Sequence, residues 1–219
     1  RAVNRLLTPM KSPFLKIPLA LALFACASLS FAAEIEVSSL SELAQVAAQD
    51  GQQIRLKPGV YRMADYLTEP VLTEIRASLD RTQKRPPVPM FVFRGKDNHI
   101  ACDGAVIEID TTLYKKLPGG YVRCLIVAGS GNTLSGLSIR NTGPNQGSGG
   151  NILSLAGERT TLENVTLHVR GSWPYGYGDL LGKGGPNLVS LQKQSGIQVL
   201  GSGSVLRRCR VFSGAPGHC

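Results

Sequence analysis

The sequence contains little of several features that would place a protein in a large structural class. Aromatic residues make up only 6% of the 219 residues, and the 25 glycines follow no three-residue period, which excludes a collagen-like chain. Beyond the N-terminal region, no apolar run approaches the ~20 residues that a membrane-spanning helix requires. The hydrophobic fraction of 42% is ordinary, which excludes a disordered chain. We therefore expect a folded protein with a sizeable core.

Motifs for several common chemistries are also missing. The chain has no glycine-rich phosphate loop, no nucleophile elbow and no Cys–His nucleophile signature. Acidic residues are not clustered, so we predict no cofactor and no dedicated metal site, although Asp179 with backbone carbonyls would bind Ca²⁺ weakly. Lysine and arginine do not gather among aromatic residues, which argues against nucleic acid as a partner.

The N-terminal residues are predicted to direct export. A basic region at 11–16 precedes the apolar run 17–29, and the small residues that follow suit signal-peptide cleavage near Ala32. The run is too short for a comfortable membrane span. Alternatively, Cys26 becomes a lipidated N-terminus that tethers the mature protein to a membrane. We assign residues 1–32 to upstream sequence and signal peptide, and we expect a periplasmic or extracellular protein.

Export changes how the charge and the cysteines are interpreted. Loss of residues 1–32 removes four basic side chains and no acidic ones, which lowers the net charge from +9 to +5 and favours an acidic partner. Export permits disulfides, and four cysteines allow three connectivities, but their spacing fits no zinc motif. Disulfides and buried thiols both remain open for Cys102, Cys124, Cys209 and Cys219.

Internal repetition is the most informative feature of the sequence. Taking Gly129, Gly157 and Gly201 as origins, apolar residues recur four and two positions before each glycine and five, eight and ten positions after it. Alternation by two indicates short strands with one buried face, so each repeat predicts a coil that shares one core with its neighbours. The aligned apolar positions are Leu125, Val127, Leu134, Leu137 and Ile139; Leu153, Leu155, Leu162, Val165 and Leu167; and Ile197, Val199, Leu206, Cys209 and Val211, with a weaker copy at Phe91, Phe93, Gly95 and Ile100.

From about residue 34 onward, these repeats resemble the right-handed parallel β-helix of the pectate-lyase-like superfamily. Residues 41–48 have the pattern of a short amphipathic helix, and residues 50–61 are similar to the cap and first coil of that superfamily. The resemblance implies an all-β fold, a right-handed parallel β-helix solenoid with a short N-terminal capping helix, as a single domain over 33–219. The superfamily includes lyases, hydrolases, epimerases and non-catalytic adhesins, so the fold alone does not assign an activity.

Two insertions interrupt the repeats. Residues 62–90 are basic and proline-rich, with a predicted helix over 71–79, and residues 171–187 are rich in glycine and aromatic residues. Insertions on a constant scaffold commonly build the binding face. The chain ends at Cys219 directly after a predicted strand pair, and a bare coil end would be unstable, so we expect the domain to be incomplete at its C-terminus.

The insertion at 171–187 is the candidate binding loop. Aromatic rings supply flat apolar faces that stack on sugar rings, and glycines allow close approach to a ligand. Alternatively, the loop only covers the stacked coils. The predicted substrate-binding residues are Trp173, Tyr175, Tyr177 and Asp179.

Export, positive charge and the resemblance together imply a monomeric, carbohydrate-active protein whose partner is an acidic, uronate-containing polysaccharide. The superfamily's lyases use a base to remove the proton α to the uronate carboxylate while a cation neutralises that carboxylate. We expect Lys183 or His168 to act as the base and Arg170 as the cation, in a lyase or an epimerase.

Two other functions compete with this hypothesis. A non-catalytic carbohydrate-binding or adhesin-like solenoid would need only the repeats and the aromatic loop. A glycoside hydrolase would need two carboxylates about 5–10 Å apart. No two acidic residues occupy matched offsets on adjacent coils: the positions equivalent to Glu163 hold Ser135 and Arg207. Hydrolysis is therefore the weaker enzymatic hypothesis, with Asp103, Glu108, Asp110, Glu163 and Asp179 as its candidates.

Overall fold

The computed structural model divides the chain into two compact units, Arg1–Phe31 and Ala32–Cys219. Within the second unit, the structure describes residues 33–84, 86–118, 121–143, 151–169 and 195–213. The account that follows concerns these residues.

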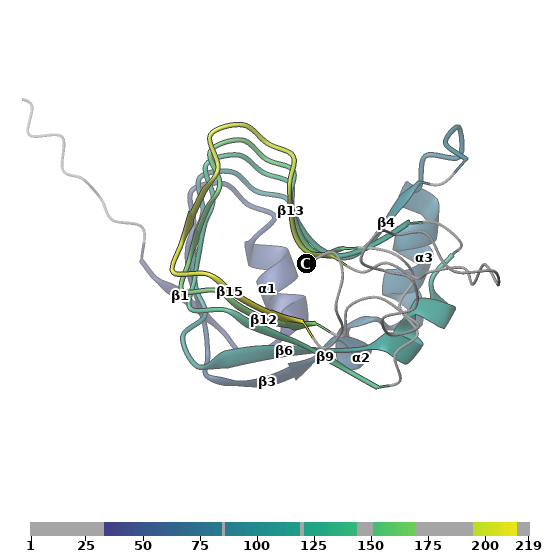
Figure 1. The fold of residues 1–219 in the computed structure, drawn as a ribbon, viewed down its shortest axis with the longest axis horizontal. Coiled ribbons are helices and arrows are strands. Elements are labelled where there is room, and N and C mark those ends of the chain that lie inside the picture. The colour runs from purple at the N-terminus through teal and green to yellow at the C-terminus, as the bar shows by residue number, and fades with distance from the viewer. Residues whose placement is uncertain (1–32, 85, 119–120, 144–150, 170–194, 214–219) are drawn as a thin grey trace, which may run out of the picture. The chain divides into compact units, whose positions relative to one another are not determined.

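Three parallel β-sheets form the second unit (Figure 1). Sheet A contains β1 (Ile35–Val37), β2 (Gln53–Leu56), β5 (His99–Ala101), β8 (Thr133–Ser135), β11 (Thr161–Glu163) and β14 (Val205–Arg207). Sheet B contains β3 (Gly59–Arg62), β6 (Ala105–Asp110), β9 (Ser138–Thr142), β12 (Thr166–Val169) and β15 (Arg210–Ser213). Sheet C contains β4 (Pro87–Phe93), β7 (Tyr121–Val127), β10 (Asn151–Leu155) and β13 (Ser195–Val199).

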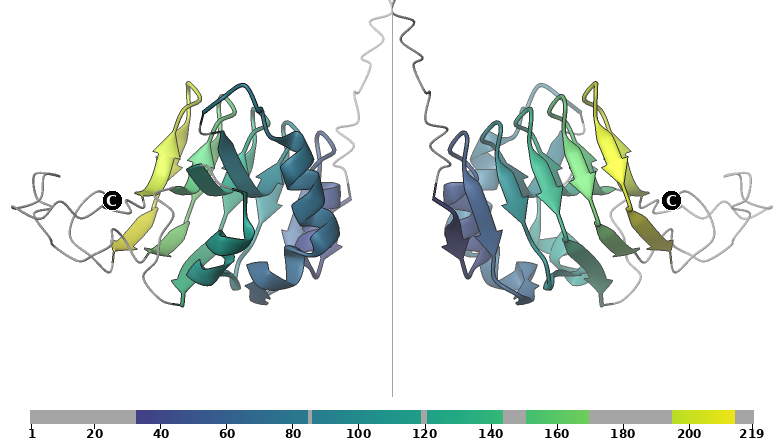
Figure 2. Two further views of the ribbon diagram at one scale, coloured as in Figure 1. Left: turned by 90° about the vertical axis from the view of Figure 1, so that its right-hand side faces the viewer. Right: turned by 90° about the vertical axis from the view of Figure 1, so that its left-hand side faces the viewer.

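From β4 onward the chain visits the sheets in the fixed order C, A, B, so each of these strands pairs with strands of the same sheet in adjacent coils and not with its neighbour in sequence. The first two strands differ, because β1 and β2 both belong to sheet A and pair with each other. Figure 2 shows these coils as successive rows, with β1 and α1 (Leu40–Val46) at one end and β14 and β15 at the other. Mostly β structure in stacked parallel sheets is the arrangement of a parallel solenoid.

The strand register confirms the predicted repeats. Leu155 lies opposite both Val127 and Val199, so these three residues form one layer. The other predicted layers are also in register, and the weaker copy joins them, because Phe91 lies opposite Leu125. In the last described coil, Val199 is 48% exposed, whereas Val127 and Leu155 are fully buried.

The glycines at the repeat origins are required by close backbone stacking. A Cβ atom on Gly129 would lie 1.8 Å from the carbonyl oxygen of Gly95, and one on Gly157 would lie 2.1 Å from that of Gly129. Gly201 has the same relation to Gly157. Since real Cβ atoms do not approach a carbonyl oxygen so closely, a larger residue would force the coils apart.

The turns differ in length according to the sheets that they join. The C-to-A turns, here called the short corner, comprise residues 94–98, 128–132, 156–160 and 200–204, which is one constant length. The B-to-C connections, here called the long corner, comprise residues 63–86, 111–120, 143–150 and 170–194. The variation in coil length therefore falls mainly on the long corner.

Helices occur in the first part of the predicted insertion 62–90 and between β1 and β2, whereas the last four residues of that insertion belong to strand β4. Ser39 caps α1, accepting a hydrogen bond of 3.1 Å from the Glu42 amide, and α1 lies within two residues of the prediction. The helix predicted at 71–79 is observed as α3 (Glu69–Ser78), which follows α2 (Met63–Tyr66). A 3₁₀ helix, η1 (Thr111–Lys116), occupies the next long corner.

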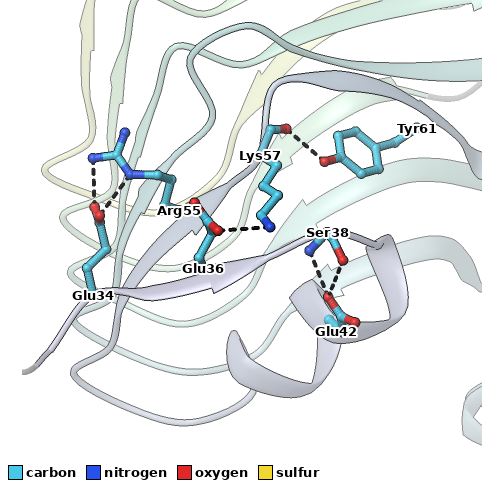
Figure 3. A network of polar contacts seen from close by, with 7 residues as sticks. All are labelled: Glu34, Glu36, Ser38, Glu42, Arg55, Lys57 and Tyr61. Atoms are coloured by element: carbon cyan, nitrogen blue, oxygen red, sulfur yellow. Dashed lines mark hydrogen bonds and ion pairs between the residues drawn. The ribbon is translucent and has the colours of Figure 1, made fainter.

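Charged pairs tie the first two strands of sheet A together (Figure 3). Arg55 binds Glu34 through two hydrogen bonds of 2.8 and 3.0 Å, and Lys57 lies 2.9 Å from Glu36. Hydrogen bonding from the Arg55 guanidinium lowers the pKa of the Glu34 carboxyl. These pairs are exposed, so each stabilises the fold only weakly.

Three of the four cysteines that follow residue 32 are described, and all three are free thiols. Cys102 and Cys124 are buried, and desolvation raises the pKa of each thiol to about 12. Cys209 is half-buried, and Cys219 lies outside the described residues. Over the described ranges, no helix is both long enough and apolar enough to cross a membrane.

Candidate functional site

The long corner is where the structure brings variable chain segments together. Both predicted insertions belong to it, because 62–90 spans the connection from β3 to β4 and 171–187 lies between β12 and β13. Each of these connections runs from the C-terminal end of a sheet B strand to the N-terminal end of a sheet C strand. Side chains at those two sets of strand ends therefore lie beside the variable segments.

Most of the predicted site residues lie outside the described residues. These are the proposed cation Arg170, the proposed base Lys183, and the sugar-binding candidates Trp173, Tyr175, Tyr177 and Asp179. Their roles stay predictions. His168, the alternative base, is described.

His168 lies on the exposed face of sheet B. In β12 it alternates with Leu167 and Val169, which are buried, and its own side chain is exposed. Its ring stacks on Phe212 of β15, with ring centroids 4.7 Å apart and planes 9° from parallel. On its other side, His168 lies in register with Arg140 of β9.

Side chains of alternating charge continue from His168 across the exposed face of sheet B, at the positions in register with it. Arg140 donates a hydrogen bond to Glu108, whose second oxygen lies 3.9 Å from Arg62. The Arg140 side chain remains 51% exposed, so its guanidinium keeps donors available for a ligand. Arg62, Glu108, Arg140, His168 and Phe212 are hereafter called the sheet B row.

Three of the acidic candidates for a glycoside hydrolase, Glu108, Glu163 and Asp110, each have a partner within the protein. Glu108 is held between arginines, and Glu163 pairs with Arg208. Asp110, two residues after Glu108, accepts hydrogen bonds from the hydroxyl and amide of Thr112, and these bonds lower the pKa of its carboxyl. A general acid requires the opposite, a raised pKa, so Asp110 is unsuited to that role.

A second polar group lies on sheet C and extends from the strand starts that follow the long corner to the strand ends that precede the short corner. Tyr121 donates a hydrogen bond of 2.9 Å to Asn151, which donates in turn to Gln198. The Arg123 guanidinium lies 5.9 Å from the centre of the Tyr121 ring, and Arg123 is in register with Asn151. Ser154 is in register with Gln198. Tyr121, Arg123, Asn151, Ser154 and Gln198 are hereafter called the sheet C cluster.

The sheet C cluster contains unsatisfied polar atoms. Asn151 is 1% exposed and Ser154 is fully buried. Within the described part of the chain, Arg123 Nε and Ser154 Oγ are buried and have no hydrogen-bond partner. Buried polar groups nearly always have partners, so these two atoms mark a place where a water molecule or a ligand would complete the hydrogen bonding.

A cavity of about 260 Å³ opens beside the first coil. Ser38, Ser39 and Ser41 line one side and Tyr61 and Arg62 the other. Since Arg62 also begins the sheet B row, the cavity adjoins one end of that row.

Sequence reasoning missed Arg140, Phe212 and the sheet C cluster. Arg140, His168 and Phe212 each lie eleven residues after a repeat-origin glycine, so counting that offset in every coil would have aligned them. Arg123 and Asn151 lie two residues before the first aligned apolar position of their coils. Alternation extended from Leu125 would instead have placed residue 123 on the buried face, because the sequence does not show that the alternation breaks at Cys124 and Leu125, which are both buried.

Comparison with known proteins does not assign the chain: no protein-family model and no curated protein matches it. In the described ranges, no group of three or more His, Cys, Asp or Glu side chains is placed to hold a metal ion. Weak Ca²⁺ binding at Asp179 lies outside those ranges and stays a prediction.

Proposed function

We propose that this protein is an exported, carbohydrate-active right-handed parallel β-helix of the pectate-lyase-like type, with α1 as its N-terminal cap. It acts on an acidic, uronate-containing polysaccharide as a lyase or an epimerase. The observation that carries the proposal is the register of Arg140 with His168 on the exposed face of sheet B. A cation beside a proton acceptor is the combination that uronate chemistry requires.

The chemistry assigned to this pair is removal of the proton α to the carboxylate. His168 accepts the C5 proton, and the charge that develops on the carboxylate is neutralised by Arg140. In a lyase, the C5–H electron pair forms the C4–C5 double bond while the C4–O bond breaks and the leaving oxygen takes a proton. In an epimerase, a proton returns to the opposite face of C5. Lys183 and Arg170, close in sequence to His168, are the further candidates for the same two roles.

The experiment incubates the secreted protein with alginate, pectate and glycosaminoglycans. It follows the absorbance of the unsaturated uronate that β-elimination leaves, together with proton exchange at C5, which reports epimerisation. We expect one of the two signals with at least one substrate. Silence of both signals with every acidic polysaccharide would reject the lyase or epimerase assignment.

The role of His168 is tested with a matched histidine. We expect His168→Ala to lower the rate by roughly 10²–10⁴-fold, which is the usual cost of losing a general base. His99→Ala removes another exposed histidine, on sheet A, and should leave the rate unchanged. If His168→Ala keeps activity within about tenfold, the base is another residue, with Lys183 the next to test.

One observation favours the non-catalytic alternative, a carbohydrate-binding or adhesin-like solenoid. The parallel stack of His168 on Phe212 covers one face of the imidazole and builds a flat platform of the kind that holds a sugar ring. Glycan binding without turnover, retained when Lys183, His168 and Arg170 are all replaced by alanine, would support this second function.

A further inference from the structure

Arg123 differs from other described arginines in what its guanidinium contacts. Arg55, Arg140 and Arg208 each hydrogen-bond to a glutamate, and Figure 3 shows the two-bonded contact of Arg55 with Glu34. No ion pair joins Arg123 to any carboxylate of the described residues, and its guanidinium lies against the ring of Tyr121. Arg123 is nevertheless half-buried. Burying part of a guanidinium without a counter-ion costs free energy, so binding of an anion beside Arg123 would be favourable.

The neighbours of Arg123 add uncharged hydrogen-bonding groups. Tyr121, Asn151 and Gln198 form a chain of hydrogen bonds, which fixes the orientation of the Asn151 amide between the other two side chains. These groups come from three adjacent strands, β7, β10 and β13, so the strand pairing of sheet C holds them rigidly. A ligand bound at Arg123 would meet a preorganised polar surface.

The two unsatisfied atoms identify what the ligand supplies. Arg123 Nε is a donor without an acceptor, and Ser154 Oγ is a hydroxyl without a partner, in both cases counting the described residues. A carboxylate oxygen satisfies the Nε–H, and the flat guanidinium edge matches the two oxygens of one carboxylate. A ligand hydroxyl can both donate to and accept from a serine hydroxyl.

We propose that the sheet C cluster is a carboxylate-binding subsite, with Arg123 as the carboxylate receptor and Tyr121, Asn151, Ser154 and Gln198 as partners for the ligand's hydroxyl groups. The ligand class is a hydroxylated carboxylate. Such a group comes either from a uronate residue within a polysaccharide or from a free sugar acid. The subsite rests on the proposed function only for the first of these sources, because it includes neither His168 nor Arg140.

The experiment measures binding to the full chain by calorimetry, so it does not depend on turnover. The probes are a uronate oligosaccharide, the same oligosaccharide after its carboxyl groups are reduced to alcohols, and free galacturonate. The variants are Arg123→Lys, which keeps the charge but loses the flat two-donor edge, and Ser154→Ala. Arg55→Lys is the matched control, because Arg55 already has a carboxylate partner within the protein. Circular dichroism and thermal unfolding establish that each variant is folded.

We expect the unmodified protein to bind the uronate oligosaccharide and its carboxyl-reduced form to bind at least ~10-fold more weakly, as loss of a hydrogen bond to a charged group predicts. Arg123→Lys should weaken binding by a similar factor, Ser154→Ala by a smaller one, and Arg55→Lys should have no effect. Binding of the oligosaccharide alone would identify a polymer-bound uronate as the source, and binding of galacturonate as well would identify a free sugar acid.

The proposal is overturned if neither carboxylate probe binds, if the carboxyl-reduced oligosaccharide binds equally well, or if folded Arg123→Lys keeps full affinity. Loss of the subsite and loss of the proposed function give different results. Carboxylate-dependent binding without turnover would support the subsite and reject the lyase or epimerase. If the Arg123→Lys variant keeps both full turnover and full affinity, the lyase or epimerase would be supported and the subsite rejected.

Discussion

The short corner and the long corner of each coil differ in length, packing and chemistry. At the short corner, Gly129 stacks directly on Gly95, and the buried side chain of Asn132 bridges the same two coils. At the long corner, connection lengths vary from coil to coil, and Arg123, near the start of β7, carries an unsatisfied Nε atom among the described residues. Among the described residues, Asn132 at the short corner has hydrogen-bond partners within the protein, whereas Arg123 beside the long corner has an unpartnered Nε. The comparison separates residues that hold the coils together from residues that we propose to bind a ligand.

The largest expected effect is at the glycine stack. Gly129→Ala would place a Cβ atom 1.8 Å from a carbonyl oxygen of the preceding coil, and backbone on both sides leaves it no room to move. We expect a loss of roughly 3 kcal/mol or more in unfolding free energy, measured by urea denaturation. The control Glu158→Ala, in the exposed part of the next short corner, should change stability by less than ~0.5 kcal/mol. Equal effects of the two substitutions would show that the coils do not stack through these glycines.

A smaller loss is expected at Asn132. Its amide group donates to the carbonyls of Gly95 and Gly129 at 2.8 Å each and accepts from the Asn98 amide at 2.9 Å. Asn132→Ala leaves these buried groups unpaired and should cost ~2–3 kcal/mol by urea denaturation.

The next coil supplies the control for Asn132. Thr160 occupies the equivalent position, and its hydroxyl donates to the Gly157 carbonyl at 3.1 Å. Asn132→Thr should therefore lose less unfolding free energy than Asn132→Ala. If the threonine variant is no more stable than the alanine variant, side-chain bonding at this corner contributes little.

The smallest effect is expected at the long corner. Asp110 caps η1 through Thr112, and Asp110→Ala should cost about 0.5–1 kcal/mol. Because these hydrogen bonds lower the pKa of the Asp110 carboxyl below its ordinary value, the contribution of Asp110 to stability is present above that ordinary pKa and is lost as the pH falls through the lowered folded-state pKa. Urea midpoints of the wild-type and Asp110→Ala proteins should therefore converge in acid. A difference that persists in strong acid would contradict the capping role.

The repeated core was predictable because the same apolar offsets recur in every coil. Leu125, Leu153 and Ile197 align in sequence and lie in one layer of the structure. The reason for the origin glycines was not predictable, since it depends on the distance between backbones of adjacent coils. Sequence alternation alone places Leu125 inward, but it does not show that Tyr121 and Arg123, at the start of the same strand, belong to the sheet C cluster.

The candidate site was less predictable than the fold. Glu108 faces Arg140 although their offsets from the origin glycines differ, because the second coil carries extra residues before β6. A fixed offset therefore cannot find that pair. The loop residues predicted from their chemistry, such as Trp173 and Lys183, lie outside the described residues, so their proposed roles stay predictions.

The most direct test of the comparison is hydrogen exchange of the full chain with and without a uronate oligosaccharide. We predict slower exchange on binding in peptides that contain the end of β12 and the starts of β7 and β10. The short corner, including Asn98 and Asn132, should be unchanged. Protection confined to the short corner, or spread evenly over both corners under conditions where calorimetry shows binding, would contradict the assignment of the long corner as the binding side.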